Sequence, residues 1–74
     1  MNSEKIVVER QSNTGIWHIA YLERSLKANL EMLLRTGNTN GYVPLGVFDS
    51  FIDADLFIDK LKDRLGENRA VIRD

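Results

Sequence analysis

The stretch from Gly41 to Gly66 reads GYVPLGVFDSFIDADLFIDKLKDRLG and carries the strongest structural signals of the chain. Residues 42–48 are rich in β-branched and aromatic side chains, which is typical of a strand. Ser50 and Asp53 have the spacing of a helix N-cap and its third helical residue, and Gly66 stands where a helix stop is expected. The stretch therefore predicts a strand followed closely by a capped helix.

Apolar residues recur every three or four positions in this helix. A helix has 3.6 residues per turn, so the spacing puts them on one face and predicts that this face packs on a sheet. The apolar residues of this face are Ala54, Phe57, Ile58, Leu61 and Leu65. Asp55, Asp59 and Asp63 form a separate row. We interpret that row as a solvated face, because the helix lacks the loop with which proteins wrap calcium.

The N-terminal residues predict a β-hairpin, since residues 6–8 and 16–22 favour strands and the turn formers 12–15 separate them. A two-residue turn at Asn13 and Thr14 would place the large apolar side chains on one face, and we favour it for that reason. Its pairs would be Arg10 with Trp17, Glu9 with His18, Val8 with Ile19, Val7 with Ala20 and Ile6 with Tyr21. A three-residue loop with Gly15 left-handed would shift this register by one.

Residues 25–36 predict a second helix, with Ser25 as N-cap and Gly37 just past its end. Its apolar residues Leu26, Leu30, Leu33 and Leu34 follow helical spacing. Pro44 places the strand 42–48 at a sheet edge or a bulge, and residues 70–72 predict a short last strand. Residues 1–74 are therefore expected to form one small α+β domain of order β-β-α-β-α-β, with an antiparallel or mixed sheet and both helices on one face.

Composition excludes several classes of protein. The chain has 74 residues and no cysteine, so disulfides and thiolate metal sites are excluded. A net charge of −1 offers no general attraction to nucleic acid or anionic membranes. The N-terminal residues lack the pattern of a signal peptide, and no apolar run approaches the length of a membrane span. We expect a cytoplasmic protein without a cofactor.

Two features invite a catalytic or ligand-binding interpretation. His18, the only histidine, titrates near neutral pH, but no second ligand or orienting group is placed beside it except Glu9. We interpret it as the cross-strand partner of Glu9. The loop from Gly37 to Gly41 has two glycines, yet it precedes a strand, whereas phosphate-binding loops precede a helix. Neither feature predicts a catalytic residue, a cofactor site or a metal site, and we expect no enzyme.

The second face of the hairpin is the predicted partner surface. With both helices on one side of the sheet, apolar residues on the other side would stay open beside the polar loop 37–41. The predicted partner-binding residues are Val7, Ile16, His18, Ala20, Leu22, Asn38 and Asn40. A protein partner or a second copy of the chain is expected to cover them. We therefore expect a small protein-interaction module that acts as a regulator, adaptor or inhibitor of a larger protein, by analogy with small phage-encoded proteins.

Two short segments resemble a known family. Residues 15–19, GIWHI, and residues 45–54, LGVFDSFIDA, are similar to the Gly-x-Trp strand and the Leu-Gly-x-Phe turn of AP2-type domains and integrase arm-binding domains. The resemblance implies a three-stranded sheet that enters the DNA major groove, with Arg10, Trp17 and Tyr21 near the DNA. Nucleic-acid binding of this type is the alternative function.

Overall fold

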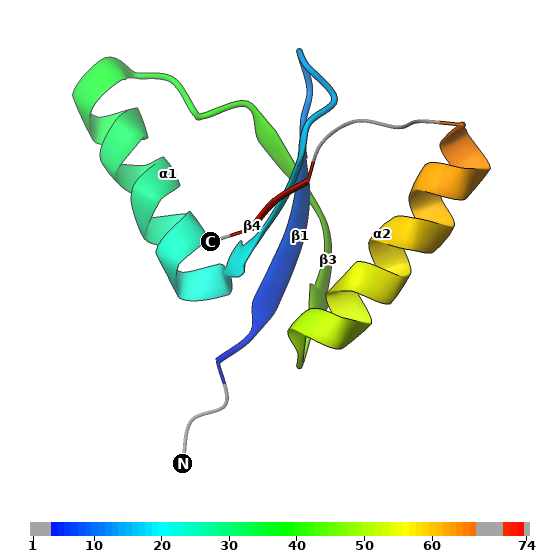
Figure 1. Cartoon of the computed structure of the whole chain (residues 1–74). Coiled ribbons are helices and arrows are strands. Elements are labelled where there is room, and N and C mark those ends of the chain that lie inside the picture. The colour runs from blue at the N-terminus through cyan, green and yellow to red at the C-terminus, as the bar shows by residue number, and fades with distance from the viewer. Residues whose placement is uncertain (1–3, 67–70, 74) are drawn as a thin grey trace.

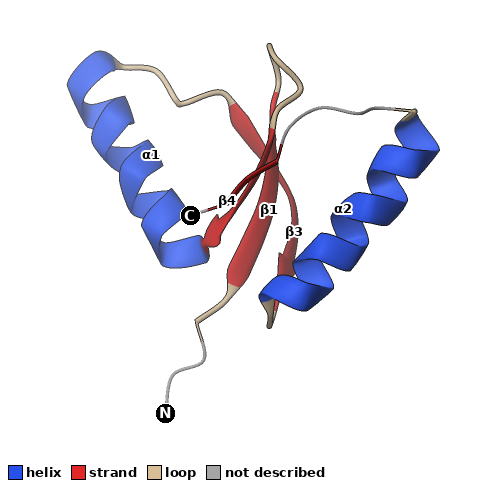
Figure 2. Cartoon of the chain, viewed as in Figure 1, coloured by secondary structure: helices blue, strands red, loops and turns tan. Residues whose placement is uncertain are grey.

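The computed structural model describes residues 4–66 and 71–73 and contains six elements (Figure 2). In chain order they are β1 (Ile6–Gln11), β2 (Trp17–Tyr21), α1 (Leu22–Thr36), β3 (Tyr42–Phe48), α2 (Phe51–Leu65) and β4 (Val71–Arg73). The predicted α+β class and the order β-β-α-β-α-β are confirmed. Ala70, which was expected to begin the last strand, lies outside the described residues.

The four strands form one mixed sheet in the order β3-β1-β2-β4. β1 pairs antiparallel with both β2 and β3, whereas β4 pairs parallel with β2. β3 lies at one edge and contains Pro44, as predicted, and the pairing of β1 with β3 shifts register between Val8 and Glu9. The chain thus passes from the β3 edge to the β4 edge through α2, which lies across one face of the sheet.

The hairpin has the favoured register. Ile6 pairs with Tyr21, Val8 with Ile19 and Arg10 with Trp17. The turn itself is longer than expected. The backbone amide of Gln11 donates to the Ile16 carbonyl, and the amide of Gly15 donates to the Gln11 carbonyl, both over 2.8 Å. A four-residue loop therefore replaces the predicted two-residue turn without changing the register.

The two helices lie on opposite sides of the sheet, which corrects the expectation that both cover one face (Figure 1). Side chains of a strand alternate between faces. Ile6 and Val8 of β1 pack with α2, whereas Glu9 bonds to Ser25 of α1. The reason is local: β2 ends at Tyr21 and α1 begins at Leu22, so no loop exists that could carry α1 to the other face.

The apolar core lies between the sheet and α2. Its buried members are Ile6, Val8, Trp17, Ile19, Ala54 and Ile58, with Tyr21, Phe48, Phe51, Phe57, Leu61 and Val71 packed around them. This agrees with the expected stripe of α2 except at Leu65, which is exposed. The indole Nε1 of Trp17 has no hydrogen-bond partner among the described residues, so the ring is held by apolar contact.

The ends of α2 have the predicted caps. The Ser50 hydroxyl accepts a hydrogen bond from the Asp53 amide over 3.1 Å, and Asp53 lies in the first turn, where a negative charge is favourable. Gly66 ends the helix in the left-handed conformation. Local sequence signals thus set both boundaries of this helix.

Replacing Ile58 with alanine should lower the free energy of unfolding by about 2 to 5 kcal/mol, because it leaves a cavity beneath α2. Leu56→Ala is the matched control: Leu56 is on the same helix but exposed, and its loss should change the free energy by less than about 1 kcal/mol. Urea unfolding followed by the fluorescence of Trp17 measures both. Equal effects of the two substitutions would show that α2 presents a different face to the sheet.

Candidate functional site

The first turn of α1 differs from the predicted one. The helix begins at Leu22, with Tyr21 at the N-cap position and no side-chain cap. The backbone amide of Leu22 instead donates to the Lys5 carbonyl over 2.8 Å, which ties the helix start to the chain before β1. Ser25, expected as the N-cap, lies one turn further along and is buried against the sheet. Ser25 therefore fixes the side of α1 to the sheet and does not cap the end of the helix.

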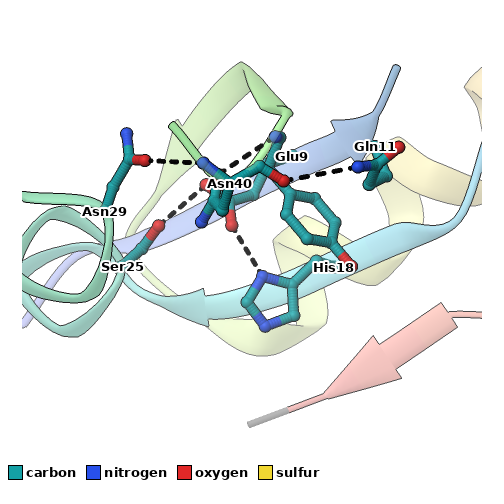
Figure 3. A network of polar contacts seen from close by, with 7 residues as sticks. Glu9, Gln11, His18, Ser25, Asn29 and Asn40 are labelled. Atoms are coloured by element: carbon teal, nitrogen blue, oxygen red, sulfur yellow. Dashed lines mark hydrogen bonds and ion pairs between the residues drawn. The ribbon is translucent and has the colours of Figure 1, made fainter. Parts of the chain in front are cut away.

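The anchor of Ser25 is the carboxylate of Glu9 in β1 (Figure 3). The Ser25 hydroxyl donates to Glu9 Oε1 over 2.8 Å, and Nδ1 of His18 in β2 lies 2.6 Å from Glu9 Oε2. Glu9 is only 5% exposed. Because a buried carboxylate is costly unless its oxygens are bonded, the two donors stabilise Glu9 and connect β1, β2 and α1 at one point. The predicted pairing of Glu9 with His18 is confirmed.

A second polar contact holds the middle of α1. The Asn29 side-chain oxygen accepts a hydrogen bond from the Asn40 amide over 3.1 Å. The Asn40 side chain accepts from the Tyr42 amide over 3.0 Å, and the Asn40 carbonyl accepts from the Gln11 side chain over 3.3 Å (Figure 3). The loop from Gly37 to Gly41 is thus bonded to α1, β1 and β3 through Asn40.

Ser25, Glu9 and His18 do not have the geometry of a catalytic triad. In a triad the histidine stands between the hydroxyl and the carboxylate and takes the hydroxyl proton. Here Glu9 stands between the other two, and the Ser25 hydroxyl donates to the carboxylate. Within residues 4–66 and 71–73, no three histidine, aspartate or glutamate side chains gather as a metal-binding group. The network connects β1, β2 and α1.

The polar anchoring of α1 leaves its leucines largely exposed. Leu26 and Leu30 each follow an anchored residue, Ser25 or Asn29, and so lie about 100° around the helix from it. The exposed fractions are 60% for Leu26, 55% for Leu30, 44% for Leu33 and 78% for Leu34. We call these four residues the α1 leucine stripe. Their helical spacing was recognised in the sequence.

The surface expected to bind a partner is largely covered. Val7 is 1% exposed and Ala20 is fully buried, because α1 lies over the face that was expected to be open. Ile16, His18 and Leu22 are half-buried, Asn40 is half-buried in its bonded loop, and Asn38 is exposed. The structure does not bring the seven residues together as one open patch. The leucine stripe is an exposed apolar surface that reasoning from the sequence did not assign to a partner, because spacing alone does not show what a helix face meets.

The residues that the AP2 resemblance placed near DNA are on the sheet face beneath α2. Trp17 is fully buried in the core, and Tyr21 packs against the core with its ring 5.3 Å from that of Phe51. The guanidinium carbon of Arg10 lies 5.8 Å from the centre of the Trp17 ring.

Comparison of the chain with protein-family models, with curated proteins and with solved structures gives no match. Among the described residues, neither helix is long and apolar enough to cross a membrane. The site therefore has to be interpreted from its own contacts.

Replacing Ser25 with alanine should lower the free energy of unfolding by about 1 to 3 kcal/mol, because it leaves one oxygen of a buried carboxylate without a donor. Ser12→Ala, at an exposed turn position, is the control and should change it by less than about 0.5 kcal/mol. Urea unfolding of both variants measures the difference. If Ser25→Ala is as mild as the control, the contact with Glu9 does not hold α1.

Proposed function

We propose that the protein is a small, non-enzymatic protein-interaction module that acts on a larger protein as a regulator, adaptor or inhibitor. Its docking surface is the α1 leucine stripe. The observation that carries the proposal is that four leucines on one helix are each 44% to 78% exposed and are not covered by the sheet that α1 contacts. Contiguous apolar surface of this kind marks interaction sites.

The binding mode that fits this surface is a helix laid against an apolar groove or a second helix. An amphipathic helix presents anchors at i, i+4, i+7 and i+8, which is the spacing from Leu26 to Leu34. The other route to a protein partner, strand addition at β3, is less favourable because Pro44 lacks an amide donor. The stripe is therefore the surface that we assign to the partner.

The chemistry of the polar network supports the non-enzymatic part of the proposal. Glu9, the only buried carboxylate among the described residues, already contacts His18 and Ser25 through its two oxygens. A net charge of −1 and the buried position of Trp17 also weigh against nucleic-acid binding. The partner is thus expected to be a protein that offers apolar side chains.

Leu30→Glu should abolish partner capture while leaving the fold intact, because it puts a charge in the middle of the stripe and not in the core. The test compares immobilised native and variant chains in a lysate of the native host, with captured proteins quantified by mass spectrometry. Binding through apolar contact should survive an increase of salt from about 0.1 to 0.5 M, whereas nucleic-acid binding would fall steeply.

Leu56→Glu is the matched control, since Leu56 on α2 is 56% exposed and Leu30 on α1 is 55% exposed. The control should capture the same proteins as the native chain. Circular dichroism of both variants establishes that they are folded. Equal capture by Leu30→Glu and the native chain would place the functional surface elsewhere.

A further inference from the structure

The two helices are attached to the sheet by different kinds of contact. In α1, all of whose residues are described, only Ser25 is buried. In α2 the buried residues are Ala54 and Ile58, and both belong to the apolar core. Burial of a large apolar side chain generally stabilises a fold more than a hydrogen bond does, because folding only exchanges bonds to water for bonds within the protein. The attachment of α2 is therefore stronger than that of α1.

The hydrogen bonds of α1 can be exchanged for bonds to water without leaving a buried charge alone. The Ser25 hydroxyl donates to Glu9 over 2.8 Å, and the Asn29 side chain accepts from the Asn40 amide over 3.1 Å (Figure 3). If α1 moves away, water reaches the Glu9 oxygen that Ser25 occupied. Nδ1 of His18 stays beside the other oxygen, because His18 belongs to β2 and pairs with Glu9 in the sheet. Detaching α1 thus avoids the large penalty of an unpaired buried carboxylate.

The apolar surface beneath α1 is also smaller than the surface beneath α2. On the α1 side the buried apolar residues of the sheet are Val7 and Ala20, which pair with each other across β1 and β2. On the α2 side they include Trp17, Ile19 and Val8, three of the largest fully buried side chains among the described residues. The free energy of local opening rises with the apolar area that becomes exposed. The α1 side should therefore open at a lower free energy than the core.

We propose that α1 is a releasable cover on the sheet, and that the hydrogen bond from Ser25 to Glu9 is the latch that keeps it closed. In the open form the sheet and α2 stay folded, and the surface around Val7 and Ala20 is uncovered. The closed form, with the latch made, is the dominant one. This device is independent of whatever binds the leucine stripe, because it depends on the inner side of α1 and not on the exposed leucines.

Amide hydrogen exchange under native conditions tests whether α1 opens by itself. Each exchange rate is divided by the rate of the same amide in the unfolded chain. Amides in the middle of α1, residues 27–33, should exchange at least about tenfold faster than the slowest amides of α2 and β1. Their rates should also increase less steeply with low concentrations of urea, because opening of α1 exposes less surface than global unfolding. Equal rates with equal urea dependence would show that the whole domain opens as one unit and would overturn the proposal.

Two substitutions separate the cover from the core in the same exchange experiment. Ile58→Val weakens packing that the closed and open forms share, so it should speed exchange of the α2 amides about three- to tenfold and change the α1 amides less than about twofold. Ser25→Ala removes the latch and should speed exchange of the α1 amides about fivefold or more, whereas the exposed control Ser12→Ala should not. The proposal is wrong if Ile58→Val speeds both helices equally, or if Ser25→Ala leaves the α1 rates unchanged.

A pair of buried alanines tests whether the sheet beneath α1 is uncovered. Ala20 on the α1 side and Ala54 in α2 are both 0% exposed, and the native chain has no cysteine, so Ala20→Cys and Ala54→Cys each introduce one thiol at matched burial. Circular dichroism establishes that both variants are folded. Labelling under native conditions, relative to the rate of each unfolded chain, should be at least about tenfold faster for Ala20→Cys. Equal labelling, or slower labelling at residue 20, would show that α1 does not open before the core and would contradict the proposal.

Discussion

The buried carboxylate of Glu9 is the interaction on which the arrangement of this protein depends. It points toward the α1 side of the sheet, where a charged group is stable only if donors meet it. His18 supplies one donor from β2 and Ser25 supplies the other from α1. Because α1 turns Ser25 toward Glu9, Leu26 and Leu30, which follow Ser25 and Asn29 by one residue, lie about 100° around the helix and are exposed.

Local signals in the sequence were sufficient to predict α2, the register of the hairpin and the edge position of β3. Ser50 and Asp53 define the start of α2 through contacts within four residues. The alternation of Val7, Val8 and Glu9 along β1 assigns each side chain to one face of the sheet without knowledge of the rest of the fold. The face that α1 covers was not predictable in this way. Its leucine spacing describes a stripe, whereas the side that meets the sheet is set by Ser25 and Asn29, whose partners Glu9 and Asn40 are distant in sequence.

The two sides of the sheet consequently have different physical characters. The α2 side has an apolar core closed by Trp17, Ile19 and Ile58, and this core accounts for most of the buried large side chains. The α1 side buries Val7 and Ala20, carries the hydrogen bonds of Glu9 and Asn29, and leaves leucines of α1 exposed. A small domain that keeps a leucine stripe exposed gains stability when that stripe is covered, which links the position of Glu9 to the proposed role in protein association.

The most direct test of this account measures which side of α1 is accessible to solvent. Thiol labelling can do this, because the native chain has no cysteine and a single introduced thiol reports on its own position. Ser25→Cys and Leu30→Cys are compared under native conditions. The account predicts that the thiol introduced at Leu30 reacts nearly as fast as in the unfolded chain. The thiol introduced at Ser25 should react about 100-fold more slowly, because it is released only when α1 opens. Equal rates, or slower reaction at Leu30, would show that the leucines face the sheet and would contradict the anchoring by Glu9.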